Sequence, residues 1–198
     1  SDLDSDGKME LLAISCTQDG AGQNDTDIRI YSGATGSVEW NLTMTGVIPS
    51  IDVGDINGDR RPELLVAGGI EKNDSTIERR YMIRDIERNL TIWETGPIPG
   101  TGYSFIYCDD IDSDGIEEPI IKNITRVLGE KEEDRPEELY VIRMFQVLDP
   151  TNQAVLWTST PSLSRYWDDL EVIKPGLSAA PVIVIENWSY DGAWSLGA

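Results

Sequence analysis

An acidic loop of nine residues occurs three times in this chain at nearly constant spacing. The loops cover residues 2–10, 55–63 and 110–118, and we call them the first, second and third loop. They start 53 and then 55 residues apart. A unit that repeats at such a spacing is typical of solenoids and propellers, in which each repeat folds as one supersecondary element. The repeat therefore restricts the fold more strongly than any other feature of the chain.

Each loop carries the oxygen ligands that a hard cation such as calcium needs. Side chains at positions 1, 3, 5 and 9 and the carbonyl at position 7 supply a shell of oxygens. Glycine permits the sharp turn that gathers them, and the second loop differs because it has Gly58 at position 4 and Arg60 at position 6. We predict up to three Ca²⁺ ions, with ligands Asp2, Asp4, Asp6, Lys8 and Glu10, then Asp55, Asn57, Asp59, Arg61 and Glu63, then Asp110, Asp112, Asp114, Ile116 and Glu118, where Lys8, Arg61 and Ile116 act through their carbonyls.

Two other structures could carry such loops. An EF-hand needs a bidentate Glu at position 12 and flanking helices, but position 12 is Ala13, Val66 and Ile121. A solvated acidic turn without an ion is the second alternative. Glu recurs at position 9 of all three loops, which favours the ion. A short apolar run follows each loop, so we expect the loops to join strands.

The segments around the loops predict short antiparallel strands grouped in fours. Alternating apolar residues and Gly, Pro, Asn or Asp turns separate them. Four-stranded units repeated radially are propeller blades. We therefore predict an all-β fold of about three and a half blades. Residues 1–198 form one propeller region, with blades at about 1–46, 47–101, 102–162 and 163–198, of which the first and last are incomplete.

The fourth unit has lost the acidic pattern, and we assign no ion to it. Its strands are expected near residues 166–171 and 181–185. Propellers usually close with four to eight blades, and an open set would expose strand edges. The chain is therefore expected to be part of a longer polypeptide or a larger assembly.

The three loops, each followed by an apolar strand, resemble the FG-GAP/VCBS repeats of integrin-alpha-type calcium-binding propellers. The resemblance covers nearly the whole chain and is most specific at residues 2–12, 55–66 and 110–121. Residues 31–40 are similar to the outer strands of quinoprotein-like blades. The resemblance implies calcium in the loops and a role in adhesion or extracellular recognition. The phenylalanine-glycine and glycine-alanine-proline signatures are absent, so integrin-like partner binding is not implied.

Sequons for N-linked glycosylation are the second informative pattern. Six of the eight asparagines lie in Asn-x-Ser/Thr sequons, which is far more than a random arrangement would give. These are Asn24, Asn41, Asn73, Asn89, Asn123 and Asn187. The pattern predicts a glycosylated, secreted or cell-surface protein. Extracellular calcium would also fill weak sites.

The remaining composition excludes several classes of function. A net charge of −20 argues against nucleic-acid binding, and no apolar run is long enough to span a membrane. The chain has no histidine, which excludes His-based triads and His-ligated zinc. Cys16 and Cys108 are the two cysteines, and both a disulfide between them and free thiols remain open.

These patterns favour a non-enzymatic, extracellular module with a structural, adhesive or assembly role and an unidentified protein or glycan partner. Two alternatives remain. The chain could be a calcium-dependent lectin, or a propeller enzyme such as a polysaccharide lyase. Most of the clustered carboxylates are already assigned to the loops, which argues against the enzyme.

Overall fold

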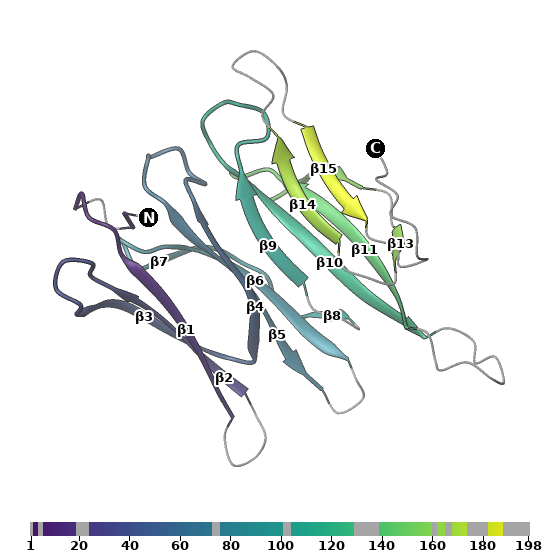
Figure 1. Ribbon diagram of the computed structural model, residues 1–198, viewed down its shortest axis with the longest axis horizontal. Helices are drawn as coiled ribbons and strands as arrows, with labels where there is room; N and C mark the ends of the chain where they lie inside the picture. The colour runs from purple at the N-terminus through teal and green to yellow at the C-terminus, as the bar shows by residue number, and fades with distance from the viewer. Residues whose placement is uncertain are drawn as a thin grey trace.

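The computed structural model describes residues 2–3, 6–18, 24–72, 76–100, 104–128, 139–159, 162–164, 168–173 and 182–187. Within these residues every regular element is a β-strand, and all strand pairs are antiparallel (Figure 1). The strands form four successive sheets along the chain. The predicted all-β fold with blade-like antiparallel sheets is confirmed. No helix long and apolar enough to cross a bilayer occurs in this described part.

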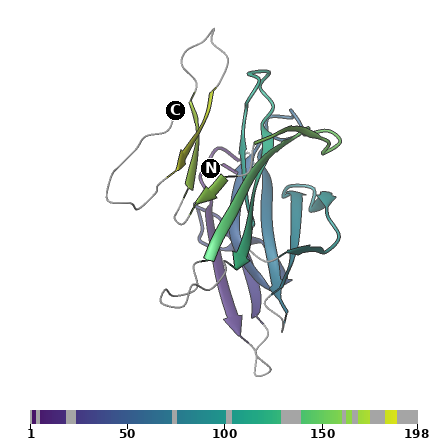
Figure 2. The ribbon, with the colours of Figure 1, turned by 90° about the vertical axis from the view of Figure 1, so that its right-hand side faces the viewer.

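The first sheet contains β1 (Leu11–Gln18), β2 (Asn24–Tyr31) and β3 (Val38–Thr45) in that order. The second contains β4 (Val47–Gly54), β5 (Glu63–Glu71), β6 (Ile77–Asp85) and β7 (Leu90–Glu94), with β8 (Ile98–Gly100) paired to β6. The third contains β9 (Ser104–Asp109), β10 (Glu118–Leu128), β11 (Leu139–Leu148) and β12 (Val155–Thr158), with β13 (Ser162–Ser164) paired to β11. The fourth pairs β14 (Asp168–Ile173) with β15 (Val182–Asn187), and Figure 2 shows these two strands beside the third sheet.

The strands β8 and β13 are an addition that the sequence did not predict. β7 bonds to residues 82–85 of β6, whereas β8 bonds to residues 77–79 of the same strand. In the third sheet, β12 bonds to residues 146–148 of β11 and β13 to residues 141–143. The outer edge of both sheets is therefore made of two short strands rather than one long strand.

The hairpins that end the first three sheets share one turn design. In each, the register shifts by one residue next to the turn, between β2 and β3, β6 and β7, and β11 and β12. Each turn has one residue with positive φ: Gly36 (72°), Asn89 (49°) and Gln153 (59°). A left-handed residue that closes a turn and creates a bulge increases the local twist of the hairpin. The three units therefore repeat in backbone geometry as well as in sequence.

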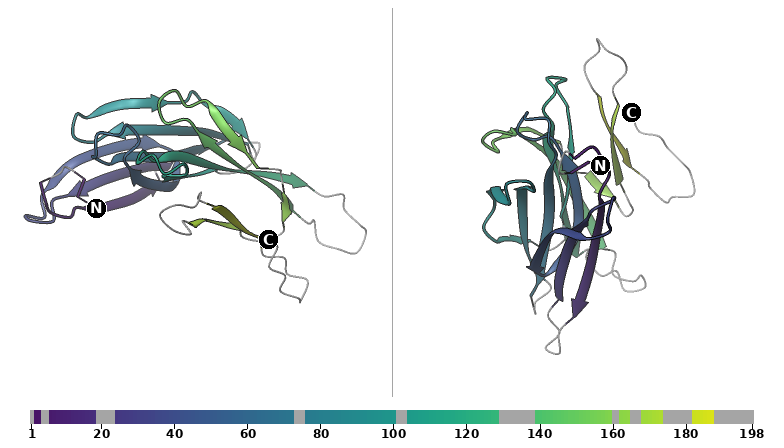
Figure 3. Two further views of the ribbon diagram at one scale, coloured as in Figure 1. Left: turned by 90° about the horizontal axis from the view of Figure 1, so that it is seen from above. Right: turned by 90° about the vertical axis from the view of Figure 1, so that its left-hand side faces the viewer.

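The core lies between the faces of neighbouring sheets. In β5, Leu64, Leu65, Val66 and Ala67 are all completely buried. Leu64 and Val66 join a cluster with residues of the first sheet, and Leu65 and Ala67 join one with residues of the third. Alternate strand residues point to opposite faces, so the second sheet is covered on both sides. The layered arrangement is seen from above in Figure 3.

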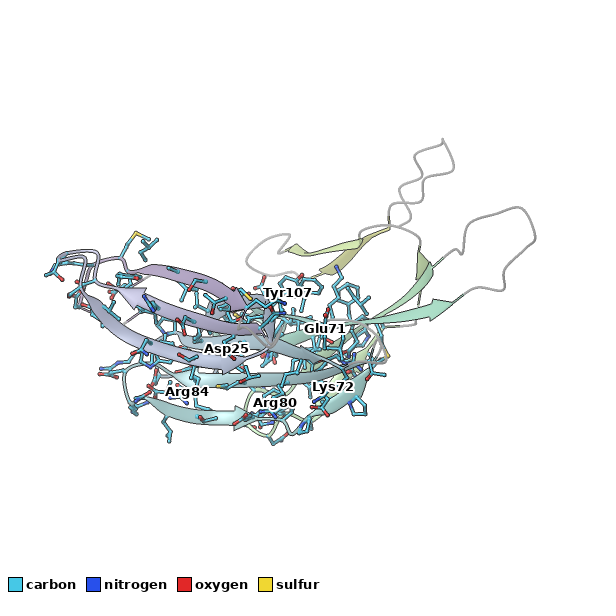
Figure 4. The ribbon with its side chains drawn as sticks, turned by 90° about the horizontal axis from the view of Figure 1, so that it is seen from below. Asp25, Glu71, Lys72, Arg80, Arg84 and Tyr107 are labelled. Carbon is cyan, nitrogen blue, oxygen red and sulfur yellow. The ribbon has the colours of Figure 1, made fainter. Side chains whose placement is uncertain are left out.

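A polar contact also joins the first two sheets. Trp40 of β3 donates from Nε1 to Oδ1 of Asn89, at 3.2 Å. Arg84 of β6 bonds the same Oδ1 at 2.7 Å, and its guanidinium lies 5.9 Å from the centroid of the Trp40 ring. Figure 4 labels Arg84 and Arg80, which lie at different points along β6. Trp40, in the last strand of the first sheet, thus packs on the β6–β7 hairpin of the second sheet.

Candidate metal centre

The second and third loops connect adjacent antiparallel strands. The pairing of β4 with β5 runs to Gly54 opposite Glu63, and that of β9 with β10 runs to Asp109 opposite Glu118. The first loop leads directly into β1. The second and third loops are thus strand-to-strand turns, as predicted, and not the helix-flanked loops of an EF-hand.

The glutamate at position 9 closes every loop in the same way. Its Oε2 accepts a hydrogen bond from the backbone N–H of position 2. The donor–acceptor distances are 2.5 Å from Leu3 to Glu10, 2.9 Å from Ile56 to Glu63 and 2.7 Å from Ile111 to Glu118. The glutamate therefore connects the start of the loop to the strand that follows it.

Two further hydrogen bonds recur in all three loops. The N–H of position 6 donates to the Asp at position 1, at 3.0 Å (Gly7 to Asp2), 2.7 Å (Arg60 to Asp55) and 3.2 Å (Gly115 to Asp110). The N–H of position 7 donates to the Asp at position 5, at 2.8 Å (Lys8 to Asp6), 3.1 Å (Arg61 to Asp59) and 2.8 Å (Ile116 to Asp114). The aspartate side chains thus hold the loop backbone in a tight turn by accepting its N–H groups.

The displaced glycine of the second loop has a structural explanation. Position 6 has positive φ in all three loops, at Gly7 (85°), Arg60 (67°) and Gly115 (91°). Position 4 has positive φ as well, at Gly58 (76°) and Ser113 (65°). The left-handed region is costly for residues with a Cβ. The second and third loops each place glycine at one of the two positions and a larger residue at the other.

Carboxylate oxygens converge in the first and third loops. Oxygens of Asp2, Asp6 and Glu10 lie within 4.8 Å of one another, and so do oxygens of Asp110, Asp112 and Glu118. Ligands of one Ca²⁺ ion, each roughly 2.3–2.6 Å from it, are separated by distances of this order. The predicted Asp4 lies outside the described residues. The carbonyl ligands Lys8, Arg61 and Ile116 remain predictions.

The aspartate at position 1 supplies the observation that points to a cation. Oδ1 of Asp2 and Oδ1 of Asp110 are buried and have no hydrogen-bond donor. A buried carboxylate oxygen without a partner is unfavourable by several kcal/mol or more. Each atom belongs to one of the two converging clusters. The residues of the first and third loops therefore fit a divalent cation.

The second loop satisfies its oxygens internally. Both oxygens of Asp55 accept backbone N–H groups, from Gly58 at 2.8 Å and Arg60 at 2.7 Å. Asn57 donates from Nδ2 to Oε1 of Glu63 at 2.8 Å. The predicted ligands Asp55, Asn57 and Glu63 thus lie together, but the oxygens of Asp55 and Glu63 accept hydrogen bonds from the protein itself.

Burial raises the pKa of the closing glutamates. Glu63 is 2% exposed, and its pKa rises to about 7, first because of burial and then because of nearby Asp59, Asp55 and Asp85, although the Ile56 N–H opposes the shift. The pKa of Glu118 is also raised, again mainly by burial. A nearby cation would favour the charged form of both groups.

The structure distinguishes among the predicted sequons. Asn41 and Asn89 are exposed and Asn24 is half-buried. Asn123 is the centre of a network: its Oδ1 accepts from Tyr81 (2.7 Å), Ser104 (2.9 Å) and Arg79 (3.2 Å), and its Nδ2 donates to Gln146 (3.1 Å). Asn73 lies outside the described residues, and only the backbone of Asn187 in β15 is described. The sequence indicates a sequon at Asn123 but not its role as the centre of this hydrogen-bond network.

Both cysteines are free thiols. Cys16 is exposed on β1, and Cys108 is half-buried on β9. Burial and the neighbouring Asp52 and Glu117 raise the pKa of the Cys108 thiol, so that it stays protonated. Cys16 lies in the first sheet and Cys108 in the third, and a disulfide between them stays a prediction.

Comparison with known families agrees with this geometry. The model of the FG-GAP-like repeat matches residues 2–66, which include the first loop, the first sheet, the second loop and the start of β5. Comparisons with curated proteins and with solved structures found no match. Residues 2–66 of this chain therefore contain an FG-GAP-like repeat.

Proposed function

We propose that the chain is an extracellular, N-glycosylated β-propeller module that has no enzymatic activity and is stabilised by calcium. Its role is in cell-surface structure, adhesion or assembly, through a protein or glycan partner. The FG-GAP-like repeat supports an adhesion-type module. The exposed sequons Asn41 and Asn89 support a secretory route.

One observation carries the calcium part of the proposal. Asp2 and Asp110 occupy the same position in their loops, and each has a buried, unpartnered Oδ1 within a carboxylate cluster. Without an ion, the carboxylates of each cluster repel one another at close range. An ion that binds the folded loop would remove this repulsion and hold the two strands in register. The expected role of calcium is therefore structural.

Thermal unfolding tests this role. We expect calorimetry to give a melting temperature several degrees higher in millimolar Ca²⁺ than in excess chelator. Each ion that binds only the folded state stabilises it by about 2.7 kcal/mol at a hundredfold excess over its dissociation constant. Asp112→Ala removes a ligand of the third loop and should reduce the calcium-dependent shift. Mg²⁺ at the same concentration is a control, since its octahedral preference suits these loops less well. Identical melting curves with calcium and chelator would refute the structural ion.

A further inference from the structure

The side chain of Arg88 lies against the second loop. Its Nη1 donates to Oδ2 of Asp59, the position-5 residue of that loop, at 3.0 Å, and to Oδ2 of Asp85 at 2.6 Å. The backbone N–H of Arg88 also bonds Oδ1 of Asp85, at 2.7 Å. Asp85 is 5% exposed, so the arginine neutralises a buried acid and a loop carboxylate together.

The hairpins of the other two sheets contain no such cation. The turn that corresponds to residues 86–89 is formed by residues 32–37 in the first sheet and by residues 149–154 in the third, and neither segment contains Lys or Arg. The turn of the first sheet also approaches its loop, because a Cβ on Gly33 would collide with the carbonyl of Met9. A positive side chain therefore reaches a loop from its hairpin in the second unit alone, among these three described units.

The formal charges of the loops also indicate that the second loop attracts a cation least. The first loop has four acids and one lysine, for a formal charge of −3, and the third has five acids, for −5. The second loop has three acids and two arginines, for −1. A divalent cation is least attracted to the loop that already contains Arg60 and Arg61 and is contacted by Arg88. The hydrogen bonds agree, because Asp55 has donors on both oxygens, whereas Asp2 and Asp110 each keep a buried free oxygen.

We infer that Arg88 takes the place of a calcium ion at the second loop, so that the three loops together bind two ions and not three. The inference rests on the proposed calcium role of the first and third loops. It replaces the ion predicted from the sequence at Asp55, Asn57, Asp59, Arg61 and Glu63 with an internal ion pair. The middle unit then keeps its shape when calcium is withdrawn, while its two neighbours depend on the ion.

Counting bound ions tests the inference. Native mass spectrometry of the chain in CaCl₂, with the stoichiometry checked by isothermal titration calorimetry, should give two ions. Asn57→Ala and Asp112→Ala form a matched pair at position 3 of the second and third loops. We expect two ions for the first variant and one for the second. Three ions in the wild type, or the loss of one ion in Asn57→Ala, would overturn the inference and leave the calcium role intact. One ion in the wild type would overturn the count of two, and no ion would refute the calcium role and this inference together.

Removing the arginine is the complementary experiment. Arg88→Gln keeps a polar side chain but removes the positive charge from Asp59 and Asp85. We expect this variant to bind a third ion and to melt at a more calcium-dependent temperature than the wild type. A folded Arg88→Gln protein that still binds two ions would show that Arg88 is not what excludes calcium. If the variant does not fold, the wild-type count and the Asn57→Ala and Asp112→Ala pair decide the matter.

Discussion

The backbone N–H of Glu117 donates a hydrogen bond of 2.9 Å to the carbonyl oxygen of Asp55. Asp55 begins the second loop and Glu117 is position 8 of the third, so the bond joins the loops of neighbouring sheets. The loops also touch through Ile116, since a Cβ on Gly58 would lie 3.1 Å from its Cδ1. The second and third units are thus connected through their loops as well as through their cores.

Replacing Glu117 by proline should isolate this connection. Proline lacks the N–H, and the second loop already has Pro62 at the same position, so the loop backbone accommodates it. We expect Glu117→Pro to lower the free energy of unfolding by about 1 kcal/mol more than Glu117→Ala, which keeps the N–H. Urea unfolding in the presence of chelator measures the difference. Equal stabilities of the two variants would show that the bond contributes nothing.

Asn123 should be much more important for stability than a surface asparagine. Asn123→Ala leaves Tyr81, Ser104 and Arg79 without their shared acceptor between the second and third sheets. The expected loss in the free energy of unfolding is about 1–3 kcal/mol. Asn41→Ala on exposed β3 is the control, with an expected change within about 0.5 kcal/mol. Similar losses for the two variants would contradict the network role of Asn123.

The same network predicts which sequons are used. When the chain is secreted from eukaryotic cells, peptide mapping should find glycan on Asn41 and Asn89, whose side chains are exposed. Asn123 should be unmodified in the folded product, because its Nδ2 bonds Gln146 and a glycan there would separate the sheets. Folded protein that carries a glycan on Asn123 would disprove the arrangement.

The left-handed loop positions allow a pair of opposite substitutions. A Cβ on Gly115 would meet nothing within 4 Å, so Gly115→Ala tests backbone strain alone. We expect it to cost about 1–2 kcal/mol. Arg60→Gly at the equivalent position removes such strain but adds freedom to the unfolded chain, so its net effect should be within about 1 kcal/mol of zero. Chemical denaturation with chelator present compares them. Equal destabilisation by the two changes would contradict the equivalence of these positions.

Glu63 predicts how stability depends on pH in chelator. Its pKa in the folded protein, about 7, lies above the unfolded value of 4.5, so the folded state binds more protons between these values. The contribution of Glu63 is therefore fully present below pH 4.5 and is lost as pH rises through 7. Glu63→Gln keeps an acceptor for the Ile56 N–H and should flatten the decline. Unfolding measured from pH 4.5 to 8 checks the sign, and a wild-type contribution that rises over this range would refute it.

Most of the strand arrangement could be predicted because its signals are local. The run from Leu64 to Ala67 indicated a buried strand, and all four residues are buried. The strands β8 and β13 could not be predicted, because each has three residues and depends on the partner strand it meets. Residue periodicity over so few positions carries little information.

Residue type and spacing predict the three loops. They do not predict how the loops differ in their contacts. The ion pair between Arg88 and Asp59 spans 29 residues, and nothing near Arg88 in the sequence indicates its partner. The sequence indicates only a sequon at Asn123 for the same reason, because its partners Tyr81 and Gln146 lie in other strands. Local motifs predict where the loops and sequons lie. Long-range contacts decide which loops are available to an ion and which asparagines are available to a glycan.

The split outer edges formed by β7 with β8, and by β12 with β13, affect how this molecule meets other molecules. A long unpaired strand is a template on which a foreign strand can add. In the second and third sheets the outermost position changes from one short strand to another partway along. An incoming strand finds only a few consecutive bonding groups before the edge is interrupted. At these two edges, crowded copies of the chain are thereby discouraged from adding strand to strand into fibres.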